Sequence, residues 1–233
     1  MSPWPHAIVL DLDGTLVDSF PGIALALDRA LVALGRAPLG LDWVRRHVGR
    51  GLASLARDAV GDDTAAELVE RFGNAYDEVL EASTPPFPGV SEALSRLAAG
   101  AALAVASNKP VRWSRRLVAH LGWDDLLPVV LGPEDAGAPK PDPAMVRLAL
   151  DRIGAEPWDA LLVGDMEVDA ATGLEAGVTV VGVARDSRSG DVLLAAGAAA
   201  VIAGVAALPT WLAAHRHRFA TAPPSRRRGG DRD

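Results

Sequence analysis

Residues 7–16 read AIVLDLDGTL, a short apolar run that ends in two aspartates, Asp11 and Asp13. The run is rich in β-branched residues, as a buried strand requires, and Gly14 stops it. The predicted strand therefore carries two carboxylates to its C-terminal end, the edge at which open α/β sheets bind ligands. Two carboxylates at such an edge repel each other, so a cation or a proton-transfer task is expected there.

Three later segments repeat this pattern of polar residues after an apolar run or in a proline-rich loop. They are LAVASNKP (103–110) with Ser107 and Asn108, GAPKPDP (137–143) with Lys140, and ALLVGDMEVDAA (160–171) with Asp165 and Asp169. The chain has only two lysines, Lys109 and Lys140, and both lie within these segments.

Taken in order, the motifs DLDGTL, SN, KP and GDxxxD resemble those of the haloacid dehalogenase superfamily of aspartate-nucleophile phosphohydrolases, over roughly residues 6–212. The details TLVDS (15–19), SNKP (107–110) and KPDP (140–143) are most similar to its phosphoglycolate phosphatase branch. The resemblance implies an α/β fold with a Rossmann-like parallel-sheet core. It also implies a small all-helical cap inserted after the first strand.

The spacing of apolar residues along the chain agrees with this division into a core and a cap. In residues 18–84, apolar residues recur at helical spacing without a convincing strand, which predicts about four helices. The later residues alternate between helix and strand patterns, which is typical of a parallel sheet. We expect a core of residues 1–17 and 85–214, a helical cap of residues 18–84 with hinges near 16–20 and 82–88, and a disordered basic tail of residues 215–233.

The resemblance implies roles for the acidic residues at the matched positions. Asp11 is the expected nucleophile, which forms an aspartyl-phosphate, and Asp13 is the expected general acid and base. Asp165 would complete a Mg²⁺ site with the Asp11 carboxylate and the Asp13 backbone carbonyl. Asp169 would either bind the metal through water or anchor Lys140.

The remaining matched residues are expected to bind phosphate. Ser107 and Asn108 would do so through the serine hydroxyl and backbone N–H groups near a helix N-terminus. Lys140 would supply the fixed cation that offsets the charge of the nucleophile and the phosphoryl group. For Lys109, a functional role and a solvated loop charge both stay open. Met166 stands where the family often has Ser or Thr, so one hydroxyl near the metal is missing.

The implied activity is Mg²⁺-dependent hydrolysis of a small phosphorylated metabolite, with 2-phosphoglycolate the favoured substrate. Asp13 argues against dehalogenation, which expels a halide and needs no proton donor. The lack of lysine in residues 18–84 argues against a phosphonatase. A β-phosphoglucomutase-like mutase and a phosphatase of another small sugar or nucleotide phosphate remain alternatives. A third alternative is a catalytically silent binding module.

A substrate with a carboxylate beyond its phosphate calls for a cation or backbone donors on the cap. The densest basic cluster in residues 18–84 is RRHVGRG (45–51), where Gly49 and Gly51 would let the backbone approach a ligand. We expect Arg50, between them, to bind the carboxylate with two parallel hydrogen bonds. The alternative is that all three arginines of the cluster are solvated surface charges.

Composition limits the remaining classes of function. The chain has no cysteine, which excludes disulfides, thiolate nucleophiles and cysteine-based zinc sites and fits a reducing cytosol. No signal peptide is visible, and the net charge of −7 argues against nucleic acid as a partner. The uncharged stretch 192–214 is alanine-rich and broken by Gly and Pro, so we expect a helix, a strand and a last helix rather than a membrane span. We therefore expect a cytoplasmic monomer or homodimer that binds a small phosphorylated metabolite, with no nucleic acid and no membrane.

Overall fold

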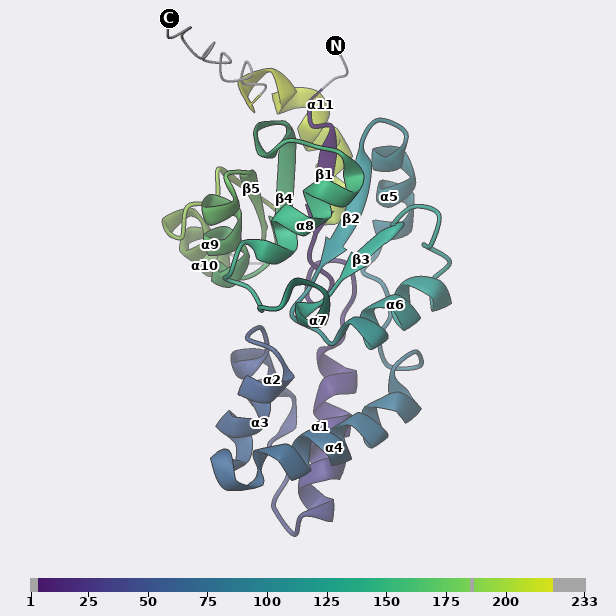
Figure 1. Cartoon of the computed structure of the whole chain (residues 1–233), viewed down its shortest axis with the longest axis vertical. Helices are drawn as coiled ribbons and strands as arrows, with labels where there is room; N and C mark the ends of the chain where they lie inside the picture. Colours follow the sequence, from purple (N-terminus) through teal and green to yellow (C-terminus); the bar gives the residue numbers. More distant parts are fainter. Residues whose placement is uncertain (1–3, 185–186, 220–233) are drawn as a thin grey trace, which may run out of the picture.

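The computed structural model describes residues 4–184 and 187–219, in which helices cover both faces of a parallel sheet (Figure 1). Six strands pair in the order β3-β2-β1-β4-β5-β6, and every pair is parallel. The strands are β1 (Ala7–Leu10), β2 (Ala102–Ala106), β3 (Val129–Leu131), β4 (Ala160–Gly164), β5 (Thr179–Val183) and β6 (Ala200–Ile202). The predicted α/β class with a Rossmann-like parallel sheet is confirmed.

Helices on the two faces bury two separate apolar layers. The first face is covered by α5 (Val90–Ala98), α6 (Val111–His120), the short turn η2 (Val205–Ala207) and α11 (Leu208–Phe219). The second face is covered by α8 (Ala144–Ile153), α9 (Glu167–Ala176) and α10 (Ser187–Ala195). This part of the chain also contains two short elements, α7 (Pro133–Ala136) and η1 (Pro157–Asp159).

Strand β1 lies in the middle of the sheet, between β2 and β4, and all four of its residues are fully buried. Its side chains alternate between the two apolar layers. Ile8 and Leu10 face the first layer, and Ala7 and Val9 face the second. This alternation explains why the strand is apolar at every position, since both of its faces are covered.

Strand register brings the polar residues that follow β1, β2 and β4 to one edge. Leu10 is level with Val105 of β2 and with Val163 of β4. The next residue, Asp11, donates its backbone N–H to the carbonyl of Val163 at 2.9 Å. Because the strand order changes direction between β1 and β4, this edge is also the topological switch point at which such sheets bind ligands.

Four helices follow β1 before the chain returns to the sheet. They are α1 (Phe20–Ala33), α2 (Gly40–His47), α3 (Leu52–Val60) and α4 (Asp62–Val79). They lie together beyond the carboxyl edge of the sheet, and residues 18–84 contain no strand (Figure 1). The predicted helices are thus present, whereas the behaviour of this helical layer as a separate cap domain stays a prediction.

The two connections between the sheet and the helical layer lie side by side. Asp18 donates its N–H to the carbonyl of Pro85 at 2.9 Å, and Phe87 donates to the carbonyl of Leu16 at 3.0 Å. Val17 and Pro86 form a bridge between them. These are the segments expected to act as hinges, and their motion stays a prediction.

The C-terminal part follows the expected division into a helix, a strand and a last helix, here α10, β6 and α11. Each helix in residues 4–184 and 187–219 is too short or too polar to span a bilayer. Helix α11 extends to Phe219, so the basic tail expected from residue 215 begins inside this helix. The remainder of that tail, residues 220–233, lies outside the described residues.

The glycine after Asp13 gives a first testable consequence. Gly14 has a φ of +81°, and a Cβ added to it would collide with the Asp165 carboxylate. Gly14→Ala is expected to lower the free energy of unfolding by a left-handed penalty of about 1–2 kcal/mol and by the collision in addition. Gly35→Ala is the matched control, because Gly35 has a φ of +71° and open space around it. Urea unfolding should show the larger loss for Gly14→Ala, and equal losses would contradict the collision.

Candidate active site

Three carboxylates converge at the edge formed by β1 and β4. Asp11 directly follows β1, Asp165 directly follows β4, and Asp169 lies in the first turn of α9. One oxygen atom of each lies within 4.8 Å of the others. Asp169 is held in place because it accepts a hydrogen bond from the N–H of Met166 at 3.1 Å. The hydroxyl of Thr15 donates to Asp165 Oδ1 at 2.8 Å and so orients the Asp165 carboxylate.

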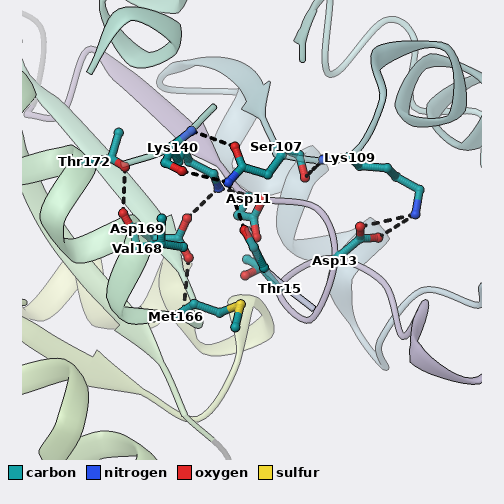
Figure 2. A network of polar contacts seen from close by, with 12 residues as sticks. Asp11, Asp13, Thr15, Ser107, Lys109, Lys140, Met166, Val168, Asp169 and Thr172 are labelled. Carbon is teal, nitrogen blue, oxygen red and sulfur yellow. Dashed lines mark hydrogen bonds and ion pairs between the residues drawn. The ribbon is translucent and has the colours of Figure 1, made fainter. Parts of the chain in front are cut away.

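Lys140 is the cation of this cluster. Its Nζ lies 2.9 Å from Asp11 Oδ1 and 2.5 Å from Asp169 Oδ1, as Figure 2 shows. Burial by itself would lower the pKa of Lys140, but Asp11 and Asp169 raise it above its usual value. The ammonium therefore stays charged, and the contact with Asp169 agrees with the expected anchoring role of that residue.

Asn108 fixes the loop that carries Lys140. Its Oδ1 accepts a hydrogen bond from the Lys140 N–H at 2.7 Å, and its Nδ2 donates to the Lys140 carbonyl at 3.0 Å. The same Nδ2 also donates to the carbonyl of Gly49 in the helical layer at 2.8 Å. The Asn108 side chain is thus engaged by protein groups. Ser107, one residue earlier, is buried and lines the cavity described below.

Asp13 lies on the other side of Asp11 from Lys140, and its carboxylate points to Lys109 (Figure 2). The Nζ of Lys109 donates to Asp13 Oδ1 at 3.1 Å and Oδ2 at 3.2 Å, and to the Tyr76 hydroxyl at 2.7 Å. Burial would lower the pKa of Lys109, but Asp13 and Tyr76 raise it above its usual value. Of the two readings left open for Lys109, the solvated loop charge is wrong, because the side chain is 3% exposed.

The buried cluster of carboxylates around Lys140 carries more negative than positive charge. Burial raises the pKa of Asp11 from an ordinary 3.8 to about 6; Lys140 opposes this shift, whereas Asp169 and Asp13 add to it. Three carboxylates facing one ammonium leave an excess of negative charge. An all-oxygen donor set of this kind fits a hard divalent cation such as Mg²⁺. Asp11, Asp165 and Asp169 are the side chains that could hold it.

A cavity of about 60 Å³ lies between the cluster and the helical layer. Its polar wall includes Asp11, Asp13, Ser107, Lys109 and Lys140, and its apolar wall includes Leu52, Leu55, Phe72, Tyr76 and Trp113. The sheet edge and the helical layer therefore both contribute to its wall.

The structure does not bring Arg50 to this cavity. Its guanidinium donates to Asp58 at 2.8 Å, and its side chain is 66% exposed, with no part in the cavity wall. The neighbouring Gly49 lies close to the sheet edge, since an added Cβ there would strike the Met166 side chain. The solvated alternative therefore describes Arg50 in this conformation.

Two residues of the site were not singled out from the sequence. Thr15 follows the two aspartates directly, and its place in DLDGTL was the available signal. Tyr76 is the only tyrosine of the chain, but its helical spacing marked it as a packing residue. Its ring does pack, with centroids 5.1 Å from Phe72 and 5.0 Å from Trp113. No local pattern indicated its hydroxyl contact with Lys109.

The raised pKa of Asp11 predicts a pH-dependent stability. In the folded chain without metal, Asp11 binds its proton up to about pH 6, whereas its ordinary pKa is 3.8. Its contribution to the free energy of unfolding is therefore complete below the ordinary pKa and is lost as the pH rises through the folded value, by on the order of 3 kcal/mol. Asp11→Asn lacks this titration.

Urea unfolding in EDTA, near pH 4 and near pH 7.5, checks this expectation. The stability of the wild type relative to Asp11→Asn should fall between the two pH values, because the other titrating groups are common to both proteins. Mg²⁺ added near pH 7.5 should stabilise the wild type more than the variant. A wild-type advantage that is the same at both pH values would contradict the raised pKa.

The chain is similar to known proteins over most of its length. The family profile described as haloacid dehalogenase-like hydrolase matches residues 8–183. A phosphoglycolate phosphatase of Rhodospirillum rubrum is 39% identical over 220 residues, which cover 89% of this chain and 91% of that protein. One of Aquifex aeolicus is 36% identical over 173 residues, covering 74% and 81%. A crystal structure described as a predicted phosphoglycolate phosphatase from Haemophilus somnus matches with a TM-score of 0.80 at 28% identity, covering 88% of this chain and 97% of that one. The chain belongs to the haloacid dehalogenase-like hydrolase family.

Proposed function

We propose that this chain is a Mg²⁺-dependent phosphatase that hydrolyses 2-phosphoglycolate through an aspartyl-phosphate on Asp11. The observation that carries the proposal is the buried Asp11 carboxylate at the end of β1, in contact with Lys140 and grouped with Asp165 and Asp169. Relatives named phosphoglycolate phosphatase, similar over most of the chain, support the choice of substrate.

Binding comes first, because a phosphate dianion repels an attacking carboxylate until its charge is neutralised. Lys140 supplies a fixed positive charge beside Asp11, and Ser107 supplies a hydroxyl at the same cavity. Bound Mg²⁺, held by Asp11, Asp165 and Asp169, would neutralise further charge and orient the phosphoryl group. Lys140 needs no reorganisation for this task, because Asn108 already holds its backbone.

The chemistry then proceeds in two displacements. An oxygen of Asp11 attacks phosphorus, the bond from phosphorus to the ester oxygen breaks, and the leaving oxygen takes a proton from Asp13. Water then attacks the aspartyl-phosphate and gives a proton back to Asp13. Phosphate leaves and the Asp11 carboxylate is restored. Asp13 is suited to both steps because it lines the same cavity from the side opposite Lys140.

The lining of the cavity favours a small anionic ester. Among the described residues that line it, the wall toward the helical layer is largely apolar, with Leu52, Leu55, Phe72 and Trp113. Such a wall offers few hydrogen-bonding groups to the hydroxyls of a sugar ring, which supports 2-phosphoglycolate over the substrate of a β-phosphoglucomutase-like enzyme.

Phosphate release from a panel of esters tests the proposal. The wild type should release phosphate from 2-phosphoglycolate with Mg²⁺, faster than from glucose 6-phosphate, and EDTA should abolish the release. Asp11→Asn should lose roughly 10⁴-fold or more in kcat, because an amide cannot form the acyl phosphate. The control Asp63→Asn removes an exposed carboxylate of α4 and should retain activity. Steady turnover by Asp11→Asn, or none by the wild type with Mg²⁺, would refute the proposal.

The role of Asp13 is tested by varying the leaving group. Asp13→Asn should slow hydrolysis of 2-phosphoglycolate by about 10²–10⁴-fold, because an alkoxide needs protonation as it departs. The same variant should slow hydrolysis of p-nitrophenyl phosphate far less, since nitrophenolate leaves without a proton. Both rates are measured in the same phosphate-release assay. Equal losses on the two substrates would remove Asp13 from this role.

A further inference from the structure

The geometry points to Lys109, supported by Tyr76, as the residue that binds the carboxylate of the substrate beyond its phosphate. This inference rests on the proposed function, and it names the specificity-determining group of that same site. It assigns to Lys109 the task that the sequence alone suggested for Arg50.

Positive charge is unevenly distributed around the cavity. Among the described residues that line it, Lys109 and Lys140 are the only cationic side chains. Lys140 is bound between Asp11 and Asp169, where the phosphoryl group reacts. Lys109 is the cation on the opposite side of Asp11, next to Asp13 (Figure 2).

Lys109 also lies within reach of the substrate carboxylate. A general acid must come within about 2.6–3.2 Å of the oxygen that it protonates. Since the Nζ of Lys109 lies 3.1 Å from Asp13 Oδ1, the ammonium lies within about 6 Å of the leaving oxygen when Asp13 acts on it. In 2-phosphoglycolate the carboxylate carbon is only two covalent bonds from that oxygen. The substrate carboxylate is therefore carried to Lys109 by the same geometry that serves catalysis.

Lys109 has enough hydrogen-bond donors to serve a further acceptor. An ammonium has three N–H donors. Lys109 donates one to the Tyr76 hydroxyl at 2.7 Å. It also donates to both oxygens of the Asp13 carboxylate, at 3.1 and 3.2 Å. One oxygen of Asp13 is enough to keep that contact. When the other turns to the leaving oxygen, a donor becomes available for the substrate carboxylate.

The remaining wall of the cavity is apolar. Phe72, Trp113, Leu52 and Leu55 line the cavity and offer no charge to an anion. A carboxylate buried among such side chains is costly unless a cation pairs with it. Tyr76 comes from α4, so the helical layer must lie against the sheet for Lys109 to be held in this position. Recognition of the carboxylate thus requires the helical layer to lie against the sheet.

A pair of unreactive ligands isolates the carboxylate. 3-Phosphonopropionate replaces the ester oxygen of 2-phosphoglycolate by a methylene group, and propylphosphonate has the same chain without the carboxylate. Isothermal titration calorimetry with Mg²⁺ measures both dissociation constants in each protein. In the wild type, 3-phosphonopropionate should bind roughly 10- to 100-fold more tightly, as a charged hydrogen bond predicts. In Lys109→Met this ratio should fall to one or below, because the acidic cluster then repels the extra charge.

Two further variants complete the test. Tyr76→Phe keeps the ring packing and removes only the hydroxyl, so it should reduce the ratio partly. Arg71→Met removes an exposed cation of α4, the helix that carries Tyr76. Arg71 pairs with Glu67 of the same helix, so this variant should keep the wild-type ratio. A purely structural role of Lys109 would weaken both ligands equally and leave the ratio unchanged, which would overturn the inference, as would a wild-type ratio near one. Calorimetry needs no turnover, so failure of the proposed phosphatase activity would be seen separately, in the phosphate-release assay.

Discussion

The ion pairs of Lys140 with Asp11 and Asp169 are the interaction on which the carboxyl edge of the sheet depends. A buried ammonium persists only when it is paired, and its two partners come from segments that are far apart in the chain. Strand register delivers Asp11, the first turn of α9 delivers Asp169, and Asn108 fixes the backbone of Lys140 itself. The charge of Lys140 thus joins the end of the central strand to α9, and its backbone ties both to the loop after β2.

This edge is built for reaction at some expense of stability. The burial that raises the pKa of Asp11 to about 6 also makes its carboxylate costly to keep, and Lys140 offsets only part of that cost. A protein selected for stability alone would place apolar residues there, as β1 does at each preceding position. The excess of negative charge instead fits a divalent cation, which under the proposed function would in turn attract the phosphate ester.

The fold and the acidic cluster were predictable because their signals are local. Apolar runs that end in polar motifs fix the strands β1, β2 and β4, and the parallel arrangement then brings their ends together. The surroundings of Lys109 and Arg50 could not be predicted from the sequence, because they depend on contacts distant in sequence or on the direction of a side chain. Lys109 is buried by Tyr76, 33 residues away, and Arg50 turns outward to Asp58. Spacing alone distinguishes neither outcome.

The paired connections at the base of the helical layer have a consequence for how this architecture can vary. Hydrogen bonds and a bridge hold Leu16–Asp18 against Pro85–Phe87, so the inserted segment starts and finishes at one point. With respect to the sheet, the insertion is a loop whose two ends are held together. Changing the length of such a loop changes its closure entropy only slightly. The helices above the reactive edge can therefore be lengthened, shortened or exchanged while Asp11 keeps its place between β2 and β4. The same arrangement of residues at the sheet edge can thus serve different substrates when the inserted helices change.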